Sequence, residues 1–360
     1  MKITDNKELR EYIDSLIDIN NLNMSISDMM SEIVGNQHIV NNSEVTTLMN
    51  KFHSKAVDIL SDKYTTELDI DLSNDEDEDI FNYYIKERIH QLNSGEYTSN
   101  PFYKTVKVNN IVDGDYEIVM DKYLPYELFA YKDMTIDEDF GELNSFGFFT
   151  NEFPFLAINH KGVTWMSITP NEIETMKDSL SKVKGDILVL GLGLGYYPFM
   201  AALKDEVKSI TVIEIDKKVI ELFNKHLYPH FINKEKIKII NIDAFEYLKV
   251  NADYDYAFID LWHDPYDGVE LFIKSKRLEK NGKEYHYWLE SSMYALLRRC
   301  FISLLEEQLA GCKEDNYKTS KSITDTIINK YYEQTKKIDL TSVSQLKELL
   351  SDQSLLNMLI

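Results

Sequence analysis

Residues 188–197 read LVLGLGLGYY. A continuous apolar run is typical of a buried strand in a parallel sheet, and glycines at 191, 193 and 195 allow a tight turn that lets the backbone approach a ligand closely. A helix that begins after such a turn offers its free N–H groups to the same ligand. We therefore expect a strand, a ligand-binding turn and a helix here.

The spacing of the glycines excludes two common phosphate-binding motifs. A dinucleotide fingerprint requires G-x-G-x-x-G, but Tyr196 stands at the third glycine, and the frame that starts at Gly193 places Pro198 there. A Walker loop requires a glycine-lysine pair after four residues, which this stretch lacks.

Strand-like and helix-like segments alternate on both sides of the turn. In order, we expect strands at 187–190, 210–213, 237–240 and 256–259, and helices at 198–204, 217–227, 244–249 and 269–276. The strands are continuous apolar runs, as expected for a sheet covered on both faces. This pattern predicts a Rossmann-like, doubly wound parallel sheet with its ligand at the carboxyl ends of the strands.

Acidic residues follow three of these strands. Glu214 and Asp216 come after the second strand, and Asp260 comes after the fourth. Asp243 comes after the third strand and is followed by Ala244. Any one of these acids could simply cap the next helix. Their joint order after the glycine turn favours a shared ligand.

The G-x-G-x-G turn followed by these acids resembles class I S-adenosylmethionine-dependent methyltransferases and their spermidine synthase relatives. The resemblance covers residues from about 184 to 265 and implies the cofactor S-adenosylmethionine, with no metal. In the family, the acid after the second strand binds the ribose hydroxyls, and Asp243 corresponds to the acid that faces the adenine amine. The cofactor-binding residues implied are Gly191, Gly193, Gly195, Glu214, Asp216, Asp243, Ala244 and Asp260.

Catalytic residues are expected after the fourth strand. Alkylation of a protonated amine requires an aligned acceptor and a group that removes a proton. The resemblance implies that Asp260, His263 and Asp264 supply this chemistry, while Trp262 and Tyr266 would wall the pocket and attract a cation. The alternative is that Asp264 only opens the next helix and His263 is a surface residue.

The same stretch departs from two subclasses of the family. Spermidine synthases carry Asp-x-x-Asp-Pro at this strand end, whereas residues 260–265 read DLWHDP and are one residue longer. Amino-methylating DNA enzymes carry Asp-Pro-Pro-Tyr directly after the strand, and here Asp264-Pro265-Tyr266 lacks the second proline and starts four residues late. The β-hairpin that usually closes a methyltransferase sheet is not evident either.

Three functions follow, in this order. The first is a methyltransferase that acts on a small or cationic acceptor, such as an amine. The second is aminopropyl transfer of the spermidine synthase type. The third is a non-catalytic ligand-binding or assembly module, whose large flanking regions would mediate homo-oligomerisation.

The flanking segments predict a four-part organisation. We expect a helical amino-terminal region at 1–98, a small β-rich lobe at 99–169, the Rossmann-like domain at 170–290 and a helical region at 291–360. Within the first region, apolar spacing predicts helices at 43–63 and 80–92.

The lobe and the approach to the glycine turn carry their own signals. Asp113-Gly114 and Lys161-Gly162 predict two β-hairpins, the first with arms at 105–108 and 116–120. Thr169, Pro170 and Glu172 match a capping box and predict a helix from 170 to about 182. Asn171 and Glu172 are candidates to line the methionine end of the cofactor.

Composition limits the partners and the compartment. A formal charge of −22 over 360 residues disfavours nucleic acids and anionic membranes. No apolar run approaches the ~18 residues that a membrane span requires. A polar amino terminus and only two cysteines indicate a cytoplasmic protein. His226 and His230 could bind a metal, but Pro229 disfavours that geometry.

Overall fold

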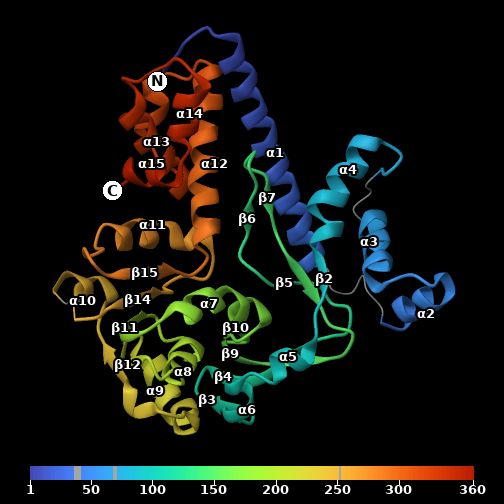
Figure 1. Cartoon of the computed structure of the whole chain (residues 1–360), viewed down its shortest axis with the longest axis vertical. Helices are drawn as coiled ribbons and strands as arrows, with labels where there is room; N and C mark the ends of the chain where they lie inside the picture. The colour runs from blue at the N-terminus through green and yellow to red at the C-terminus, as the bar shows by residue number, and fades with distance from the viewer. Residues whose placement is uncertain (36–41, 68–70, 251–252) are drawn as a thin grey trace.

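A five-stranded parallel sheet forms the centre of the molecule. The computed structural model describes residues 1–35, 42–67, 71–250 and 253–360. In this sheet, each strand pairs in parallel with its neighbours, in the order β13-β12-β11-β14-β15 (Figure 1). The strands are β11 (Gly185–Leu190), β12 (Val207–Glu214), β13 (Ile237–Asn241), β14 (Tyr256–Ile259) and β15 (Glu284–Tyr287).

Helices connect these strands and complete a doubly wound α/β fold, as the sequence predicts. The connecting helices are α8 (Tyr196–Ala202), α9 (Lys217–Leu222), α10 (Ala244–Val250) and α11 (Pro265–Lys276), and α7 (Pro170–Lys182) precedes β11. The chain builds the sheet outward from β11 to β13 and then returns to place β14 on the other side of β11. Ligands of such sheets bind outside the carboxyl ends of the strands at this reversal point.

The fifth strand, β15, is not among the strands that the sequence predicts. It pairs in parallel with β14 and follows a turn at Gly282, whose φ is +78°. Its alternation of Tyr285 and Tyr287 with polar residues fits a strand at the edge of the sheet. A single parallel strand therefore stands after α11.

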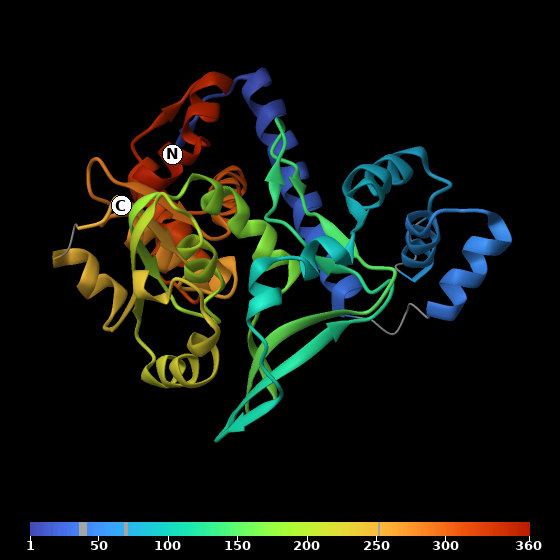
Figure 2. The same ribbon diagram turned by 60° about the horizontal axis from the view of Figure 1, so that its bottom comes forward.

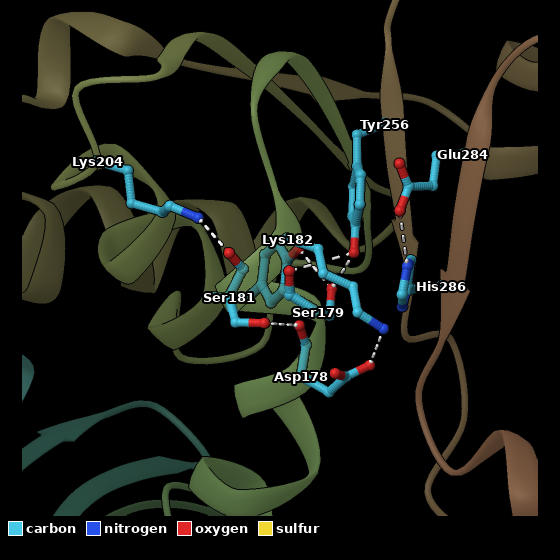
Figure 3. Close-up of polar contacts among 9 residues, drawn as sticks. Asp178, Ser179, Ser181, Lys182, Lys204, Tyr256, Glu284 and His286 are labelled. Carbon is cyan, nitrogen blue, oxygen red and sulfur yellow. Dashed lines mark hydrogen bonds and ion pairs between the residues drawn. The ribbon is translucent and has the colours of Figure 1, made fainter.

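A polar network beneath the sheet fixes α7 (Figure 3). The Ser179 hydroxyl lies 2.7 Å from the Tyr197 hydroxyl and 2.9 Å from that of Tyr256 at the start of β14. Lys204 donates from Nζ to the carbonyl oxygen of Ser181 at 3.1 Å. The carboxyl end of α7 is thus anchored, and its amino end points to the opposite edge of the sheet, where ligands are expected.

The β-rich lobe contains a four-stranded antiparallel sheet in the order β10-β9-β4-β3 (Figure 2). Its strands are β3 (Ile111–Asp113), β4 (Tyr116–Tyr123), β9 (Phe153–His160) and β10 (Val163–Ser167). Both predicted hairpins are present, but the first arm of the first hairpin is wrong. The helix α6 (Pro101–Thr105) begins with Asn100 as its cap and includes Thr105, so β3 starts only at Ile111.

Two predicted helices of the amino-terminal region differ in the structure. The helix expected at 43–63 is two helices, α2 (Asn42–Phe52) and α3 (Ala56–Glu67), because the chain turns at His53 with φ +52°. The helix expected at 80–92 ends early. It consists of α4 (Asp75–Tyr84), a short 3-10 turn and β2 (Ile89–Gln91).

Small sheets connect this region to the rest of the chain. One has the order β2-β8-β5, and another is a hairpin of β6 and β7. Their bounds are β5 (Phe129–Ala130), β6 (Thr135–Ile136), β7 (Glu142–Leu143) and β8 (Phe146–Phe148), with α5 (Ser94–Thr98) nearby in sequence. Pairing with β8 explains why residues 89–91 are extended rather than helical.

The two ends of the chain pack together. The long helix α1 (Lys7–Gly35) contacts α12 and α14, and β1 (Lys2–Ile3) pairs in parallel with β16 (Asp339–Leu340) (Figure 1). The carboxyl-terminal helices are α12 (Glu290–Leu309), α13 (Ile323–Thr335), α14 (Val343–Leu349) and α15 (Asp352–Asn357). Within the described ranges, no helix combines the length and apolar character needed to cross a membrane.

Candidate active site

The glycine turn follows β11 and packs against the end of β14. Gly191 has φ +95°, and a Cβ atom there would lie 1.9 Å from the carbonyl oxygen of Asp260, so only glycine fits. Gly195 has φ +77°, and its Cβ would meet the Phe223 ring at 2.4 Å. By contrast, a Cβ on Gly193 would meet no atom within 4 Å. The turn is therefore tight against the sheet and open at Gly193, as close approach of a ligand requires.

Glu214 lies directly beneath this turn. Its carboxylate accepts hydrogen bonds from the backbone N–H groups of Leu192 at 3.1 Å and Asp216 at 2.8 Å. The side chain thus faces the reversal point of the sheet and not the solvent beyond β12. Its position is compatible with a ribose-binding role, which stays a prediction.

Asp216 and Asp243 both begin helices. Asp216 accepts from two backbone N–H groups in the first turn of α9, and Asp243 does the same for α10. Each uses its Oδ1 atom for both bonds. Ala244 is buried at the start of α10. Their cofactor contacts stay predictions, while the capping role of both acids is a structural fact.

Two partly buried carboxyl groups meet at the carboxyl end of the sheet. Burial raises the pKa of Asp260 to about 7, with a further increase from Glu214 and a decrease from His263. Burial and the charge of Asp260 raise the pKa of Glu172 well above its usual range. Because Asp260 disfavours the charged form of Glu172, a cation bound beside this pair would be stabilised, and we refer to the pair as the cation seat.

The capping box predicted for α7 does not form. Thr169 is the first cap of α7, as expected, but its side chain makes no capping hydrogen bond. Its side chain instead hydrogen-bonds with Tyr123 at the end of β4.

Tyr123 is a site residue that the sequence analysis missed. Burial and nearby carboxylates, including Glu172, raise its pKa above the usual range, and its ring stacks on Phe129 at 4.1 Å. No local motif marks it, because β4 brings it to α7 only through pairing with β9.

The segment after Asp260 combines an exposed histidine with a capping box. Asp264 accepts from the N–H groups of Tyr266 at 2.7 Å and Asp267 at 3.0 Å, and Asp267 in turn accepts from the Asp264 N–H at 3.0 Å. Asp264 thus opens α11, and its catalytic role stays a prediction. The His263 side chain is 65% exposed, and its Nδ1 atom lies 3.0 Å from Asp267 Oδ2.

Trp262 does not wall the site as the sequence suggested. Its side chain is buried, and its Nε1 atom donates to the Trp288 carbonyl oxygen at 3.1 Å. The close approach of Gly268 leaves the indole within the core. Tyr266 is exposed and hydrogen-bonds with Arg299.

His226 joins the β-rich lobe to the α/β unit. Its Nε2 atom lies 3.3 Å from Asp113 Oδ2, and Asp113 also pairs with Lys218 at 3.0 Å and Lys225 at 2.8 Å. Hydrogen bonds from Lys225, Lys218 and His226 hold the pKa of Asp113 well below its usual range. The tip of the first hairpin is thereby held on α9.

Comparison with known proteins places residues 173–279 in the family model of the spermine/spermidine synthase domain. Ribosomal RNA small subunit methyltransferase A from Malacoplasma penetrans is 32% identical over 120 residues, which cover 33% of this chain and 41% of that protein. Polyamine aminopropyltransferase from Oceanobacillus iheyensis is 32% identical over 82 residues, which cover 21% and 16%. The chain thus spans less than half the length of either relative.

Among solved structures, spermidine synthase from Thermotoga maritima is 16% identical, with a TM-score of 0.31, and the match covers 54% of this chain and 62% of that one. The family match spans the glycine turn, the acids after β12, β13 and β14, and α11. It confirms the resemblance expected from those residues. Residues 173–279 of the α/β unit thus match the spermine/spermidine synthase domain, and the sheet around them has the doubly wound parallel order expected of a class I methyltransferase-type fold.

Proposed function

We propose that this chain transfers an alkyl group from an adenosyl sulfonium donor to an amine, and that the alkyl group is aminopropyl. The observation that carries this proposal is the pair of carboxyl groups, Glu172 and Asp260, beside the glycine turn. Buried acids that repel each other gain stability when a cation binds between them. An ammonium group supplies that cation.

The residues around the turn fit the donor. The open side of Gly193 and the Glu214 carboxylate offer backbone and acidic contacts to a nucleoside. When bound, the donor supplies an electrophilic carbon, whose bond to sulfur breaks as the new bond to nitrogen forms. Glu172 and Asp260 hold the cationic ends and orient the amine.

The charge of the site favours decarboxylated S-adenosylmethionine over S-adenosylmethionine. The first ends in an ammonium group, which favours the ionised forms of Glu172 and Asp260, whereas the second also carries a carboxylate, which disfavours them. The match to the spermine/spermidine synthase domain and the Oceanobacillus relative support the same choice. This reverses the order of functions that the sequence alone favours.

Methyl transfer from S-adenosylmethionine is the second candidate. The ribosomal RNA methyltransferase relative supports it. The extra residue in the 260–265 segment also separates this chain from the Asp-x-x-Asp-Pro pattern of spermidine synthases.

Calorimetry with both donors, followed by mass spectrometry of products formed from putrescine, tests the choice. We expect tighter binding of decarboxylated S-adenosylmethionine and a product that carries an added aminopropyl group. Glu172→Gln and Asp260→Asn should each weaken this binding about tenfold, since they remove an anionic contact of roughly 1.4 kcal/mol. Asp178→Asn, which changes an exposed carboxylate on the same helix, should change nothing.

The outcomes separate the candidates. Tighter binding of S-adenosylmethionine, with methylated product, would replace the first candidate by the second. Absence of affinity for both donors and for 5′-methylthioadenosine would overturn both.

A further inference from the structure

The extra residue after β14 changes which side chain is free to accept a proton. The Asp264 carboxylate is engaged as the cap of α11, with hydrogen bonds from two backbone N–H groups. His263, immediately before it, has an exposed imidazole. The imidazole is close enough to Asp260 to lower the pKa of that carboxyl group. A basic side chain therefore precedes the capped aspartate in sequence and interacts electrostatically with Asp260 of the cation seat.

Asp267 fixes this imidazole on its Nδ1 side. Its Oδ2 atom lies 3.0 Å from His263 Nδ1, and its Oδ1 atom accepts from the His263 backbone N–H at 3.0 Å. Its Oδ1 atom also accepts from the Asp264 N–H. Burial alone would raise the pKa of Asp267, but these donors outweigh it and hold that pKa below its usual range. The ionised carboxylate can only accept hydrogen bonds, so Nδ1 carries a proton.

We propose that Asp267 is a positioning residue, which holds His263 as the Nδ1–H tautomer so that Nε2 takes the proton from the acceptor ammonium. This inference rests on the proposed function, because it assigns the proton step of that reaction. The proton moves from the ammonium nitrogen to Nε2 and leaves the electron pair on the amine. The imidazolium then gives the proton to solvent, to which the His263 side chain is open.

The structure also defines which charges face the imidazole. Asp267 faces it from α11, and Asp260 acts on it from the end of β14. Asp267 differs from Asp260 in that it contacts a defined ring nitrogen, and this contact sets the tautomer.

Asp267 has a structural role as well, so the test must separate the two. As the third residue of α11, it completes the capping box with Asp264. Asp267→Asn keeps an acceptor oxygen for the backbone N–H groups, but its amide can donate to Nδ1 and reverse the tautomer. A matched control is Asp325→Asn, which changes the same position of the capping box of α13.

Nitrogen-15 NMR of the histidine rings gives a readout that does not depend on activity, with the His263 signals assigned by their loss in His263→Gln. We expect the Nδ1–H tautomer in the unmodified protein and the Nε2–H tautomer in Asp267→Asn. The same variant should lose about 10²-fold or more in kcat, as removal of a positioned proton acceptor does, with KM and donor affinity unchanged. Asp325→Asn should keep both the tautomer and kcat.

Two results would overturn the positioning role. One is an Nε2–H tautomer in the unmodified protein, and the other is a full kcat in Asp267→Asn despite a reversed tautomer. If the unmodified protein transfers no group to any amine, the proposed function and the proton step fail together. The NMR result then still decides whether Asp267 sets the tautomer.

Discussion

At the scale of single residues, the site depends on how closely the tip of β11 approaches the backbone of β14. Gly191 adopts φ +95° and allows no Cβ atom beside the Asp260 carbonyl oxygen. Gly193 also has positive φ, +51°, but faces open space. The two glycines therefore allow conformational strain to be separated from steric overlap.

We expect Gly191→Ala to destabilise the protein by roughly 3 kcal/mol or more, since the backbone of β14 must move. Gly193→Ala should cost only about 1 kcal/mol, the usual penalty for alanine in the left-handed region. Urea unfolding of both variants checks this difference. Equal losses would mean that the close contact between the two strand tips relaxes without cost.

Asp260 gives a prediction for pH dependence. Its pKa is about 7 in the folded protein and near 4 in an unfolded chain, so between these values the folded state binds more protons. This group therefore lowers the free energy of unfolding as pH rises from about 4 to 7. Asp260→Asn should be more stable than the unmodified protein at pH 8, by about 1–3 kcal/mol, and close to it at pH 4.

Thermal or urea unfolding at the two pH values measures this effect, with Asp178→Asn as the exposed control. The same ionisation should make amine binding tighter as pH rises through about 7, because the cation seat gains its charge. A variant that is less stable at pH 8 than at pH 4, relative to the unmodified protein, would contradict the assignment.

At the scale of elements, the parts of the sheet with their own sequence signal could be predicted. Each of the strands β11 to β14 contains an apolar run, and the turn at Gly191 marks the expected ligand edge. By contrast, β2 and β15 exist because β8 and β14 pair with them, and such pairing leaves little trace in a short segment.

The candidate site shows the same division. The acids at strand ends, such as Glu214 and Asp260, could be located because a strand end fixes their place. The electrostatic interaction of Glu172 with Asp260 could not, since it joins the first turn of α7 to the end of β14, 88 residues later in the chain. The role of Asp267 could have been predicted from the sequence, because an acid two residues after Pro265 fits a capping box.

The hairpin of β6 and β7 illustrates how an element is tied to a distant helix. Arg299 on α12 pairs with Glu142 on β7 through two hydrogen bonds, the Nε bond being 2.7 Å; Glu142 is buried and Arg299 is largely buried. At the other end, Asp133 accepts from the Ser292 hydroxyl at 2.6 Å near the start of α12. The hairpin is thus held on α12 at two points.

Arg299→Met should destabilise the protein by about 3–5 kcal/mol, because it leaves the Glu142 carboxylate buried without a partner. The double variant with Glu142→Leu should recover much of this loss. Lys122→Met, which breaks the exposed pair with Glu152, should cost less than about 1 kcal/mol. Urea unfolding of the four proteins would refute the argument if the single and double variants were equally unstable.

At the scale of the whole molecule, the amino-terminal helix belongs to the same hydrophobic core as the α/β unit. Leu9, Ile13 and Leu16 of α1 are buried in one cluster with strand residues of the sheet and with α12. A second, smaller cluster lies around α2 to α4. The four-part division made from sequence places α1 and α12 in separate regions, and their packing bears on whether those regions unfold separately.

Tryptophan fluorescence can decide this, because the three tryptophans, at 165, 262 and 288, lie in the β-rich lobe and the α/β unit and none lies in α1. We expect Ile13→Ala to cost about 2–4 kcal/mol and to lower the tryptophan-reported unfolding midpoint. Met24→Ala, at an exposed position of the same helix, should leave that midpoint nearly unchanged. If Ile13→Ala altered circular dichroism of the helices but not the tryptophan transition, α1 would unfold as a separate unit. A shift of both signals together means that the ligand-binding unit depends on the packing of α1 for its own stability.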